Sequence, residues 1–348
     1  MDPGDVQFCK RLIADSEDFD WGDLLASAWR QKVLPLVGRN LEIHGIVGGD
    51  GWPFVAAYLG NRVRTGSMLH ELDRLLVHLR DREIPVIVRK GPVLIEVVYG
   101  DPGVRRMNDI DLLIGKDDVP RIKDALIEFG YEQGTTTANR RRIEPYRREV
   151  KAAWNLWVDN LLPFIRITSD PHVRYHTVDI CRNLFQPKAG YSVPTDELFG
   201  RAVPFRVSAG TGLRLSAEDF LIDLCAHLYK ESTTLAYIEQ GADLQLSKFL
   251  DIAEYCQRSA FDADVFLATV SRHGLAEPVY FSLRLTSKVY PGAIPAALLA
   301  ALRPADETFL DVYGQSEGQP HRWQADFLTR LFDPRRARQA EGKSLLPK

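Results

Sequence analysis

The sequence predicts an α/β (α+β) fold, in which strands and helices alternate through the centre of the chain and a helical region follows. Short apolar runs bounded by Gly, Pro or Asp recur between residues 84 and 181 and indicate strands. Segments before, between and after these runs carry apolar residues at helical spacing, which is typical of amphipathic helices. With 348 residues, the chain can bury a sizeable core and form two domains, or one domain with a large lobe.

The composition is that of an ordinary globular protein, with 45% apolar and 26% charged residues. A net charge of −3 gives no bulk attraction to nucleic acid or anionic membranes, although it leaves room for a local basic patch. Four scattered cysteines are too few for a disulfide framework. No stretch reaches the roughly 20 apolar residues of a membrane span, and no apolar signal core is present. We therefore expect a cytoplasmic protein with reduced thiols and no membrane contact.

Four regions are expected along the chain. Residues 1–66 form an N-terminal helical segment, and residues 67–205 form the α/β core. Residues 206–332 form a C-terminal helical domain, and the polar residues 333–348 form a disordered tail.

The first elements of the core are a helix and a strand. One stripe of apolar residues predicts a helix over residues 67–80. The apolar run at 84–89 then indicates a buried strand, which Lys90-Gly91 ends. Pro92 suits the first turn of a helix, and the turn at 100–103 closes it.

A second strand is expected at 109–114, and it carries a pair of acids. Because side chains alternate along a strand, Asp109 and Asp111 point to the same side. Two adjacent carboxylates repel each other, and a hard divalent cation is the usual resolution. Mg²⁺ prefers carboxylate oxygens together with substrate phosphates.

The elements that follow are a helix, a basic stretch and a strand hairpin. A helix is expected from Asp117 or Asp118 to Gly130. Residues 134–150 are polar and basic, and they form either a solvated surface or an edge that contacts phosphate or RNA. Residues 162–168 and 173–181 read as a hairpin whose second strand holds Asp179 between apolar neighbours, which is unusual unless that face is wet or functional.

The remaining chain is expected to be helical. Ser216 begins a helix with a sequence similar to a capping box, in which Asp219 replaces the usual Glu. Further helices are expected at 242–258 and 262–273, and after Pro278.

A carboxylate pair on one strand and a third acid on a later strand are the arrangement that two-metal nucleotidyl transfer needs. The pair, Asp109 and Asp111, would hold two Mg²⁺ ions that clamp the nucleotide phosphates. Asp179 would complete one metal site or take the proton from an acceptor hydroxyl. By itself an Asp-x-Asp tripeptide is common and often caps helices or lines loops, but here an apolar strand and the preceding Lys-Gly turn favour the metal site.

The residues of the central stretch resemble the uncharacterised nucleotidyltransferase-like family of the polymerase-β-type nucleotidyltransferase superfamily. The matching positions are Lys90-Gly91, Tyr99, 101–103, Arg105-Arg106 and 109–113. Weaker matches extend over roughly residues 20–255. The resemblance implies a small mixed sheet with flanking helices and a C-terminal helical lobe. It also implies transfer of a nucleoside monophosphate from an NTP to an acceptor, with Asp109 and Asp111 as metal ligands and Asp179 as the third carboxylate.

Two positions depart from the wider pattern. Most of the superfamily has Gly-Ser where this chain, like its subfamily, has Lys90-Gly91. Gly91 still lets the backbone approach a phosphate at a helix N-terminus, and Lys90 would supply positive charge. Cys181 stands where the family often has His, which motivates a non-catalytic alternative.

Lys90, Gly91, Arg105 and Lys230 are the candidates for binding the NTP. Lys90 alternatively reaches solvent from a strand end. One of Arg105 and Arg106 is expected to pair with a carboxylate, and Arg105 is slightly favoured for the triphosphate. Lys230 shares a helix face with His227, which we interpret as a packed histidine, and its flexible ammonium suits phosphate.

Two other groups are interpreted as structural. Lys248 and Asp251 are taken as a surface ion pair. The aromatic residues Trp154, Trp157 and Phe164 are expected in the core rather than as a platform for a base.

The leading hypothesis is a Mg²⁺-dependent nucleotidyltransferase, with two Mg²⁺ ions and an NTP co-substrate, that acts on a small-molecule or peptide acceptor. RNA is a less favoured partner: a toxin-like transferase acting on a tRNA end is motivated by the arginines between Arg140 and Arg148. A catalytically inactive nucleotide sensor or protein-interaction module is the third alternative.

Overall fold

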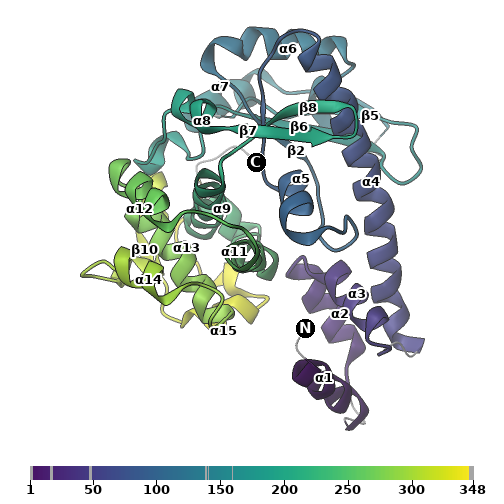
Figure 1. Ribbon diagram of the computed structural model, residues 1–348, viewed down its shortest axis with the longest axis vertical. Helices are drawn as coiled ribbons and strands as arrows, with labels where there is room; N and C mark the ends of the chain where they lie inside the picture. Colours follow the sequence, from purple (N-terminus) through teal and green to yellow (C-terminus); the bar gives the residue numbers. More distant parts are fainter. Residues whose placement is uncertain are drawn as a thin grey trace.

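The computed structural model describes residues 3–15, 19–46, 49–137, 139, 141–158 and 160–344. Figure 1 shows a sheet with helices at the top, C-terminal helices at the lower left and N-terminal helices at the lower right. The long helix α4 (Trp52–Arg80) runs from the N-terminal helices up to the sheet. This arrangement confirms the predicted mixed α/β core with flanking helices and a C-terminal helical lobe.

One mixed sheet forms the centre of the fold, with strand order β4-β3-β5-β6-β2-β1-β8-β7. Its strands are β1 (Ile87–Val88), β2 (Ile110–Leu113), β3 (Glu132–Thr136), β4 (Ile143–Pro145), β5 (Phe164–Ile167), β6 (Tyr175–Cys181), β7 (Val203–Val207) and β8 (Gly210–Arg214). Strand β2 is parallel to β6 and antiparallel to β1, and all four of its residues are buried. Strands β9 (Val312–Tyr313) and β10 (His321–Arg322) form a separate antiparallel pair.

The helices flank this sheet and build the two helical parts. In chain order they are α1 (Pro3–Asp15), α2 (Trp21–Arg30), α3 (Leu34–Ile43), α4, α5 (Gly91–Leu94), α6 (Val119–Glu128), α7 (Arg148–Trp157), α8 (Thr195–Arg201), α9 (Ala217–Thr233), α10 (Leu235–Glu239), α11 (Leu246–Arg258), α12 (Ala263–Arg272), α13 (Ala276–Val289), α14 (Ala296–Leu302) and α15 (Phe327–Phe332). Ser216 caps α9 by accepting a hydrogen bond from the Asp219 amide at 3.2 Å, as its sequence predicts.

The predicted hairpin is confirmed, because β5 and β6 pair as antiparallel neighbours. Two further strands, β7 and β8, were not expected from the sequence. Their connection contains Ser208 with a φ of 50°, and a Cβ on Gly210 would lie 2.6 Å from the carbonyl oxygen of Asp73 in α4. Strand β7 alternates over only five residues and contains Pro204, which argues against a strand, and β8 contains two glycines and a single apolar side chain.

The core lies between α4, the sheet and α9. Leu72, Leu75, Leu76 and Leu79 line one side of α4 and are buried, as the predicted stripe requires. Of the described residues, none belong to a helix that is both long and apolar enough to span a membrane.

Two of the three predicted boundaries fall within the long helix α4 or within the sheet, and the third coincides with the end of α15. Helix α4 is continuous from residue 52, so residue 66 lies in its interior. The sheet continues through β7 and β8 to residue 214, so the core extends beyond residue 205.

The tail differs from its prediction over residues 333–344, which pack against the C-terminal lobe. Arg336 is 6% exposed and forms an ion pair with Asp243, and the amide of Glu341 donates to the Tyr313 hydroxyl at 2.8 Å. Polar composition suggested disorder, but here the polar side chains find buried partners. Residues 345–348 lie outside the described part of the chain.

Candidate functional site

A buried ion pair fixes the end of β1 to the C-terminal lobe. Arg89 follows β1, and its Nε donates to Oδ2 of Asp223 in α9 at 3.1 Å. The side chains are 4% and 0% exposed. Removing either partner of such a pair is strongly destabilising, so the sheet and α9 are held in a fixed relation.

Lys90 comes next and turns towards the acidic strand. Its φ of 51° marks a sharp break between β1 and α5, and its Nζ donates to Oδ1 of Asp111 at 2.7 Å. Burial lowers the pKa of Lys90, but the neighbouring acidic groups, led by Asp111, together raise it by more, so Lys90 stays charged. Lys90 is therefore not a solvent-facing lysine at a strand end.

Asp109, Asp111 and Asp179 lie on neighbouring strands. Asp111 in β2 and Asp179 in β6 are direct partners in the parallel register, and Asp109 precedes β2 by one residue. Burial, followed by the charges of Asp111 and Asp179, raises the pKa of Asp109. Burial and Asp111 likewise raise the pKa of Asp179. Burial opposes ionisation of Asp111 too, but Lys90 and Arg89 outweigh it and lower its pKa.

The three carboxylates do not form a ready cage for a metal ion. No group of three or more His, Cys, Asp or Glu side chains that could hold a metal occurs among the residues described here. Lys90 already neutralises one oxygen of Asp111. The raised pKa values of Asp109 and Asp179 nevertheless mark a surplus of negative charge that a cation would relieve. This donor set fits Mg²⁺ that arrives with substrate phosphates, because Mg²⁺ often takes only one or two protein carboxylates.

Helix α4 holds the loop that leads into the acidic strand. Asn61 donates to the carbonyls of Gly103 at 2.8 Å and Arg105 at 3.2 Å. Asp101 accepts from the Gly103 amide and from the Tyr58 hydroxyl. A Cβ on Gly103 would lie 2.3 Å from the Tyr58 ring, so only glycine fits.

Gly91 packs tightly under this loop. A Cβ there would lie 2.8 Å from Cγ of Met107, and 3.6 Å from the guanidinium of Arg105. The lack of a side chain at Gly91 is therefore required by packing, in addition to the close phosphate approach expected from the sequence.

Arg105 is the arginine that pairs with a carboxylate. Its Nε donates to both oxygens of Asp251 in α11 at 3.0 Å, and one terminal nitrogen donates at 2.7 Å. The Tyr99 hydroxyl donates to the same Asp251 at 2.7 Å. Arg106 instead lies over the Trp29 ring at 5.1 Å, so of the two arginines it is the one whose charge is more available to a ligand.

Helix α9 presents His227 and Lys230 towards the carboxylates. Burial and nearby cations, led by Lys90, lower the pKa of His227 well below its usual value, so this imidazole is neutral at pH 7. Its Nδ1 is buried without a hydrogen-bond partner in the described part of the chain. Lys230 lies 5.5 Å from the Tyr237 ring centroid, and its charge lowers the pKa of both Asp111 and Asp179. The structure thus brings Lys230 near the predicted acids.

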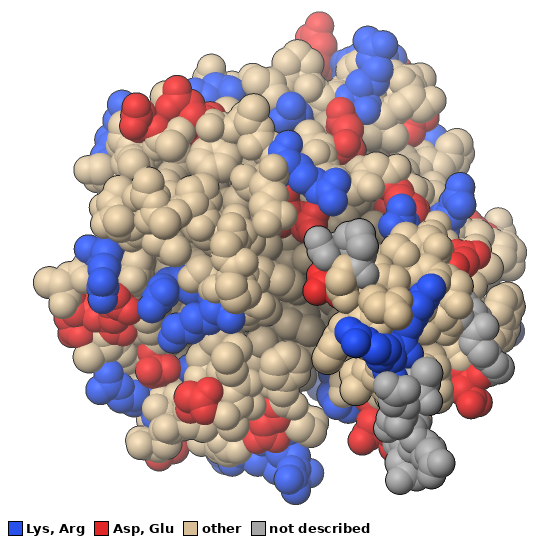
Figure 2. All heavy atoms as spheres, turned by 60° about the horizontal axis from the view of Figure 1, so that its bottom comes forward, with Lys and Arg blue, Asp and Glu red and all other residues tan. Residues whose placement is uncertain are grey.

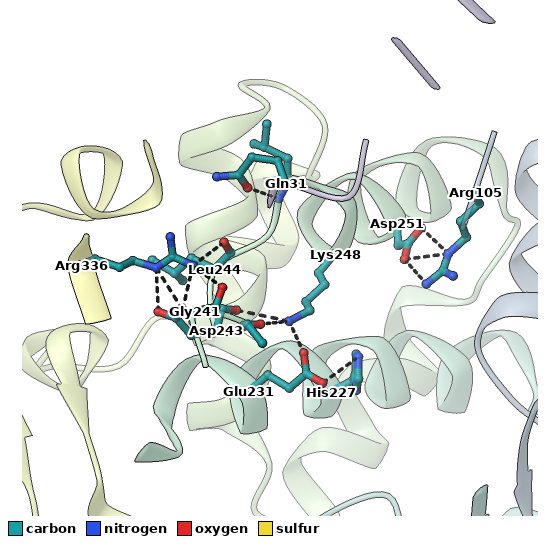
Figure 3. A network of polar contacts seen from close by, with 12 residues as sticks. Gln31, Arg105, His227, Glu231, Gly241, Asp243, Leu244, Lys248, Asp251 and Arg336 are labelled. Carbon is teal, nitrogen blue, oxygen red and sulfur yellow. Dashed lines mark hydrogen bonds and ion pairs between the residues drawn. The ribbon is translucent and has the colours of Figure 1, made fainter. Parts of the chain in front are cut away.

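The predicted surface pair of Lys248 and Asp251 is wrong, because both residues are buried and have different partners. Lys248 forms an ion pair with Glu231 of α9 and donates to the Ala242 carbonyl at 2.6 Å. Asp251 binds Arg105 (Figure 3). Spacing along one helix suggested a local pair, but α9 and the loop that leads into β2 offer closer partners.

A cavity of about 120 Å³ lies where the three parts of the molecule meet. It is lined by Asp109 and Asp111 from the sheet and by five basic side chains, which are Lys32, Lys90, Arg105, Arg106 and Lys248. Lys32 lies between α2 and α3, and the sequence analysis gave it no role. Its isolated position in a helical segment carries no motif, so tertiary proximity is the signal that reveals it.

A second cavity, of about 300 Å³, lies beyond Lys230 on the other side of α9. Aromatic side chains line it, among them Phe185, Tyr191 and Tyr229, together with the amides of Gln186 and Gln315. A small space between the two cavities is lined by Cys181, Lys90, His227 and Lys230. Cys181 is buried, which raises its thiol pKa, so it is a neutral side chain where the family often has His.

The aromatic residues expected in the core fall into two environments. Phe164 is 1% exposed and belongs to the core, whereas Trp154 is half-buried and donates from Nε1 to the Asn160 carbonyl at 2.8 Å. The side chain of Trp157 lies outside the part that the structure describes.

The basic stretch is an exposed edge near β4 and the start of α7. Arg141, Arg142, Arg147 and Arg148 are exposed, and Arg140 lies outside the described residues. Half-buried Tyr146 lies between these arginines, and burial followed by the charge of Asp179 raises its pKa. Figure 2 shows one face of the molecule, on which acidic and basic side chains are interspersed.

A comparison with models of known protein families identifies one family. A family model described as "Uncharacterised nucleotidyltransferase" matches residues 17–291. Among solved structures, the chain is similar to an antigenic nucleotidyltransferase-like protein from Paracoccidioides brasiliensis, with 12% identity and a TM-score of 0.38. That similarity covers 68% of this chain and 92% of the other. No curated protein matches this sequence.

Proposed function

Because the chain belongs to the uncharacterised nucleotidyltransferase family, we propose that it transfers a nucleoside monophosphate from an NTP to a hydroxyl group of a small-molecule or peptide acceptor. The observation that supports this most is the parallel register of Asp111 and Asp179, with Asp109 beside them and the cations of Lys90 and Lys230 close by. Surplus negative charge beside these cations suits a metal-bound polyphosphate.

The proposed reaction forms one bond and breaks one. The acceptor oxygen attacks the α-phosphorus, the bond from that phosphorus to the oxygen bridging it to the β-phosphate breaks, and pyrophosphate leaves. The hydroxyl proton passes to a carboxylate oxygen of Asp179. The raised pKa of Asp179 makes it a better base than an exposed aspartate.

The carboxylates of Asp109 and Asp111 would hold Mg²⁺, with Asp179 as the third acid. When bound, Mg²⁺ neutralises phosphate charge and favours departure of pyrophosphate. Lys90 keeps Asp111 ionised and fixes its rotamer through the bond at 2.7 Å. Lys230 and Arg106 would contact the phosphates, while Arg105 holds α11 against the loop through Asp251.

The aromatic cavity beyond Lys230 supports a small acceptor. Its volume of about 300 Å³ lies at the lower end of the usual range for small-molecule sites. Aromatic rings and two amide side chains can hold a planar or peptide-like group, and its hydroxyl would extend into the connecting space, which is lined by Cys181 of the strand that carries Asp179.

Asp109→Asn tests this proposal in the full-length protein. Asp109 has no ion pair or hydrogen bond within the described residues, so its amide variant should fold. The thermal midpoint is measured for wild type, Asp109→Asn and the exposed control Asp117→Asn, with each of the four NTPs, with and without Mg²⁺. Wild type and the control should show a Mg²⁺-dependent rise with at least one NTP, and Asp109→Asn should lose it.

Turnover is then followed as pyrophosphate release in the presence of an acceptor library of hydroxylated metabolites and Ser-containing or Tyr-containing peptides. Release by wild type and not by Asp109→Asn is the expected result. Mg²⁺-dependent nucleotide binding without release on any acceptor would favour the sensor alternative, and retained transfer in Asp109→Asn would refute the metal assignment.

RNA is a second candidate acceptor, because the exposed arginine edge reaches Tyr146 near Asp179. A tRNA bound along Arg141, Arg142 and Arg147 would place one end near the carboxylates. Binding to tRNA that weakens steeply as salt rises would support this acceptor. Absence of binding at low salt would remove it.

A further inference from the structure

We propose that Lys32, carried by the N-terminal helical segment, binds the β- and γ-phosphates of the NTP and then the pyrophosphate that leaves. The inference rests on the proposed function for the identity of the nucleotide, but its binding step is tested with inorganic pyrophosphate alone. It assigns a ligand-binding role to a part of the chain that lies outside the sheet and the C-terminal lobe.

The position of Lys32 is the first observation. It lines the cavity of about 120 Å³ opposite the sheet, together with Lys90, Arg106 and Lys248. The carboxylates of Asp109 and Asp111 lie in the same cavity. A phosphate chain that shares a cation with these carboxylates would extend towards the basic side chains.

The lack of a partner for Lys32 is the second observation. Most cations around this cavity already have an anionic partner: Lys90 has Asp111, and Lys248 has Glu231. Lys32 is half-buried, yet its ammonium has no hydrogen-bond or ion-pair partner among the residues described. A buried charge without a partner is unfavourable unless a ligand supplies one.

The surrounding charges favour a polyanion. Burial, followed by the positive charge of Lys248, lowers the pKa of Lys32. Glu231 and, more weakly, Asp109 oppose this shift, and Arg106 adds to it. Bringing like charges together in the free protein costs free energy that a bound anion recovers. Pyrophosphate carries several charges over a short length, so it can contact Lys32 and other cations of the cavity at once.

A rigid turn fixes Lys32 in place. The Gln31 side chain donates to the Leu331 carbonyl at 2.7 Å and accepts from the Leu246 amide at 2.8 Å, and the Gln31 carbonyl accepts from the Ser247 amide at 3.2 Å. Lys32 itself has a φ of 56°. Figure 3 shows Gln31 near the Lys248 network of the C-terminal lobe.

These hydrogen bonds of Gln31 argue against Lys32 being a solvated surface lysine. Gln31 is 7% exposed, and its bonds join the N-terminal segment to both α11 and the end of α15. A left-handed backbone conformation is uncommon for lysine, and the hydrogen bonds of Gln31 hold Lys32 in it. The geometry thus directs one unpaired ammonium to the cavity that holds the carboxylates.

Isothermal titration of the full-length protein with inorganic pyrophosphate, in Mg²⁺ buffer, tests the proposal. Lys32→Met removes the charge and keeps the stem, and Lys116→Met is the matched control, an exposed lysine after the opposite end of β2. Lys32→Met should weaken pyrophosphate binding at least about tenfold, as expected for one charged contact. Lys116→Met should bind as wild type does. Binding of AMP, which lacks the outer phosphates, should change by less than about threefold in Lys32→Met.

Two further measurements keep the result interpretable. The thermal midpoint of Lys32→Met without ligand should equal or exceed that of wild type, because an unpaired buried charge is removed. Gln31→Ala should weaken pyrophosphate binding less than Lys32→Met does, since the ammonium remains but loses its fixed position. Equal pyrophosphate affinity in wild type and Lys32→Met, or no binding by wild type, would overturn the inference. Pyrophosphate binding that depends on Lys32 without transfer from any NTP would instead refute the proposed function alone.

Discussion

Arg336→Met should destabilise the protein by about 3 to 5 kcal/mol, although Arg336 lies in the polar stretch that was expected to be disordered. Its Nε donates to both oxygens of Asp243 at 3.0 Å, and a terminal nitrogen donates to Oδ1 at 2.8 Å. The same nitrogen donates to the carbonyls of Leu244 at 3.0 Å and Gly241 at 3.1 Å. Arg336 and Asp243 are 6% and 1% exposed.

The magnitude follows from what the substitution leaves behind. Asp243 would remain buried without its cation, which is the costly case for a buried ion pair. The buried carbonyl of Leu244 would also lose a donor, which adds to the loss. Because a domain is commonly stable by about 5–15 kcal/mol, the variant should lose a large fraction of its total stability.

Urea unfolding followed by tryptophan fluorescence measures the effect, since the chain has 6 tryptophans. Arg338→Met is the control, because Arg338 is an exposed arginine in the same short helical turn. It should change stability by less than about 0.5 kcal/mol. The double variant Arg336→Met/Asp243→Asn should recover part of the loss, because the unpaired charge is gone.

A loss below about 1 kcal/mol in Arg336→Met would refute the reasoning, since it would mean that residues 333–344 do not pack against the C-terminal lobe in solution. The loop containing Asp243 also supplies a carbonyl to Lys248, at 3.4 Å. Arg336→Met should therefore also weaken pyrophosphate binding, and an unchanged affinity would contradict this coupling.

Three smaller predictions concern stability. Burial raises the pKa of Glu71, but hydrogen bonds from Arg166 and Tyr131 outweigh this effect and lower it. The ionised Glu71 therefore stabilises the protein above the pKa of the unfolded state, and this stabilisation is lost on acidification. In urea titrations at several pH values, Glu71→Gln should be less stable than wild type at pH 7 and should lose less stability than wild type below about pH 5. Gly103→Ala should lower stability by about 1–3 kcal/mol, because the new Cβ meets the Tyr58 ring at 2.3 Å; an unchanged thermal midpoint would contradict the loop geometry. Ser216→Ala should cost about 1 kcal/mol through loss of the α9 cap, and a Ser216→Thr variant that retains the cap should lose less in the same urea assay.

Local patterns were sufficient for much of the core. The apolar stripe of α4, the β5–β6 hairpin and the Ser216 cap each depend on residues that are close in sequence, so periodicity and capping chemistry predict them. The family followed from the residues around Asp109 and Asp111. Strands β7 and β8 were missed because both are short and carry residues that disfavour strands, Pro204 in β7 and two glycines in β8. Helix α4 was predicted too short because its first half is less regular.

The sequence by itself therefore determined the fold class and the family, and it singled out the acidic residues as candidates, because each of these depends on residues that are close together in the sequence. Tertiary structure alone decided which charges meet. Arg105 pairs with Asp251, Lys248 with Glu231, and Arg336 with Asp243, across separations that no helical or strand period encodes. Lys32 stays unpaired beside the carboxylates for the same reason: electrostatic energy depends on distance in space, and the folded chain sets that distance.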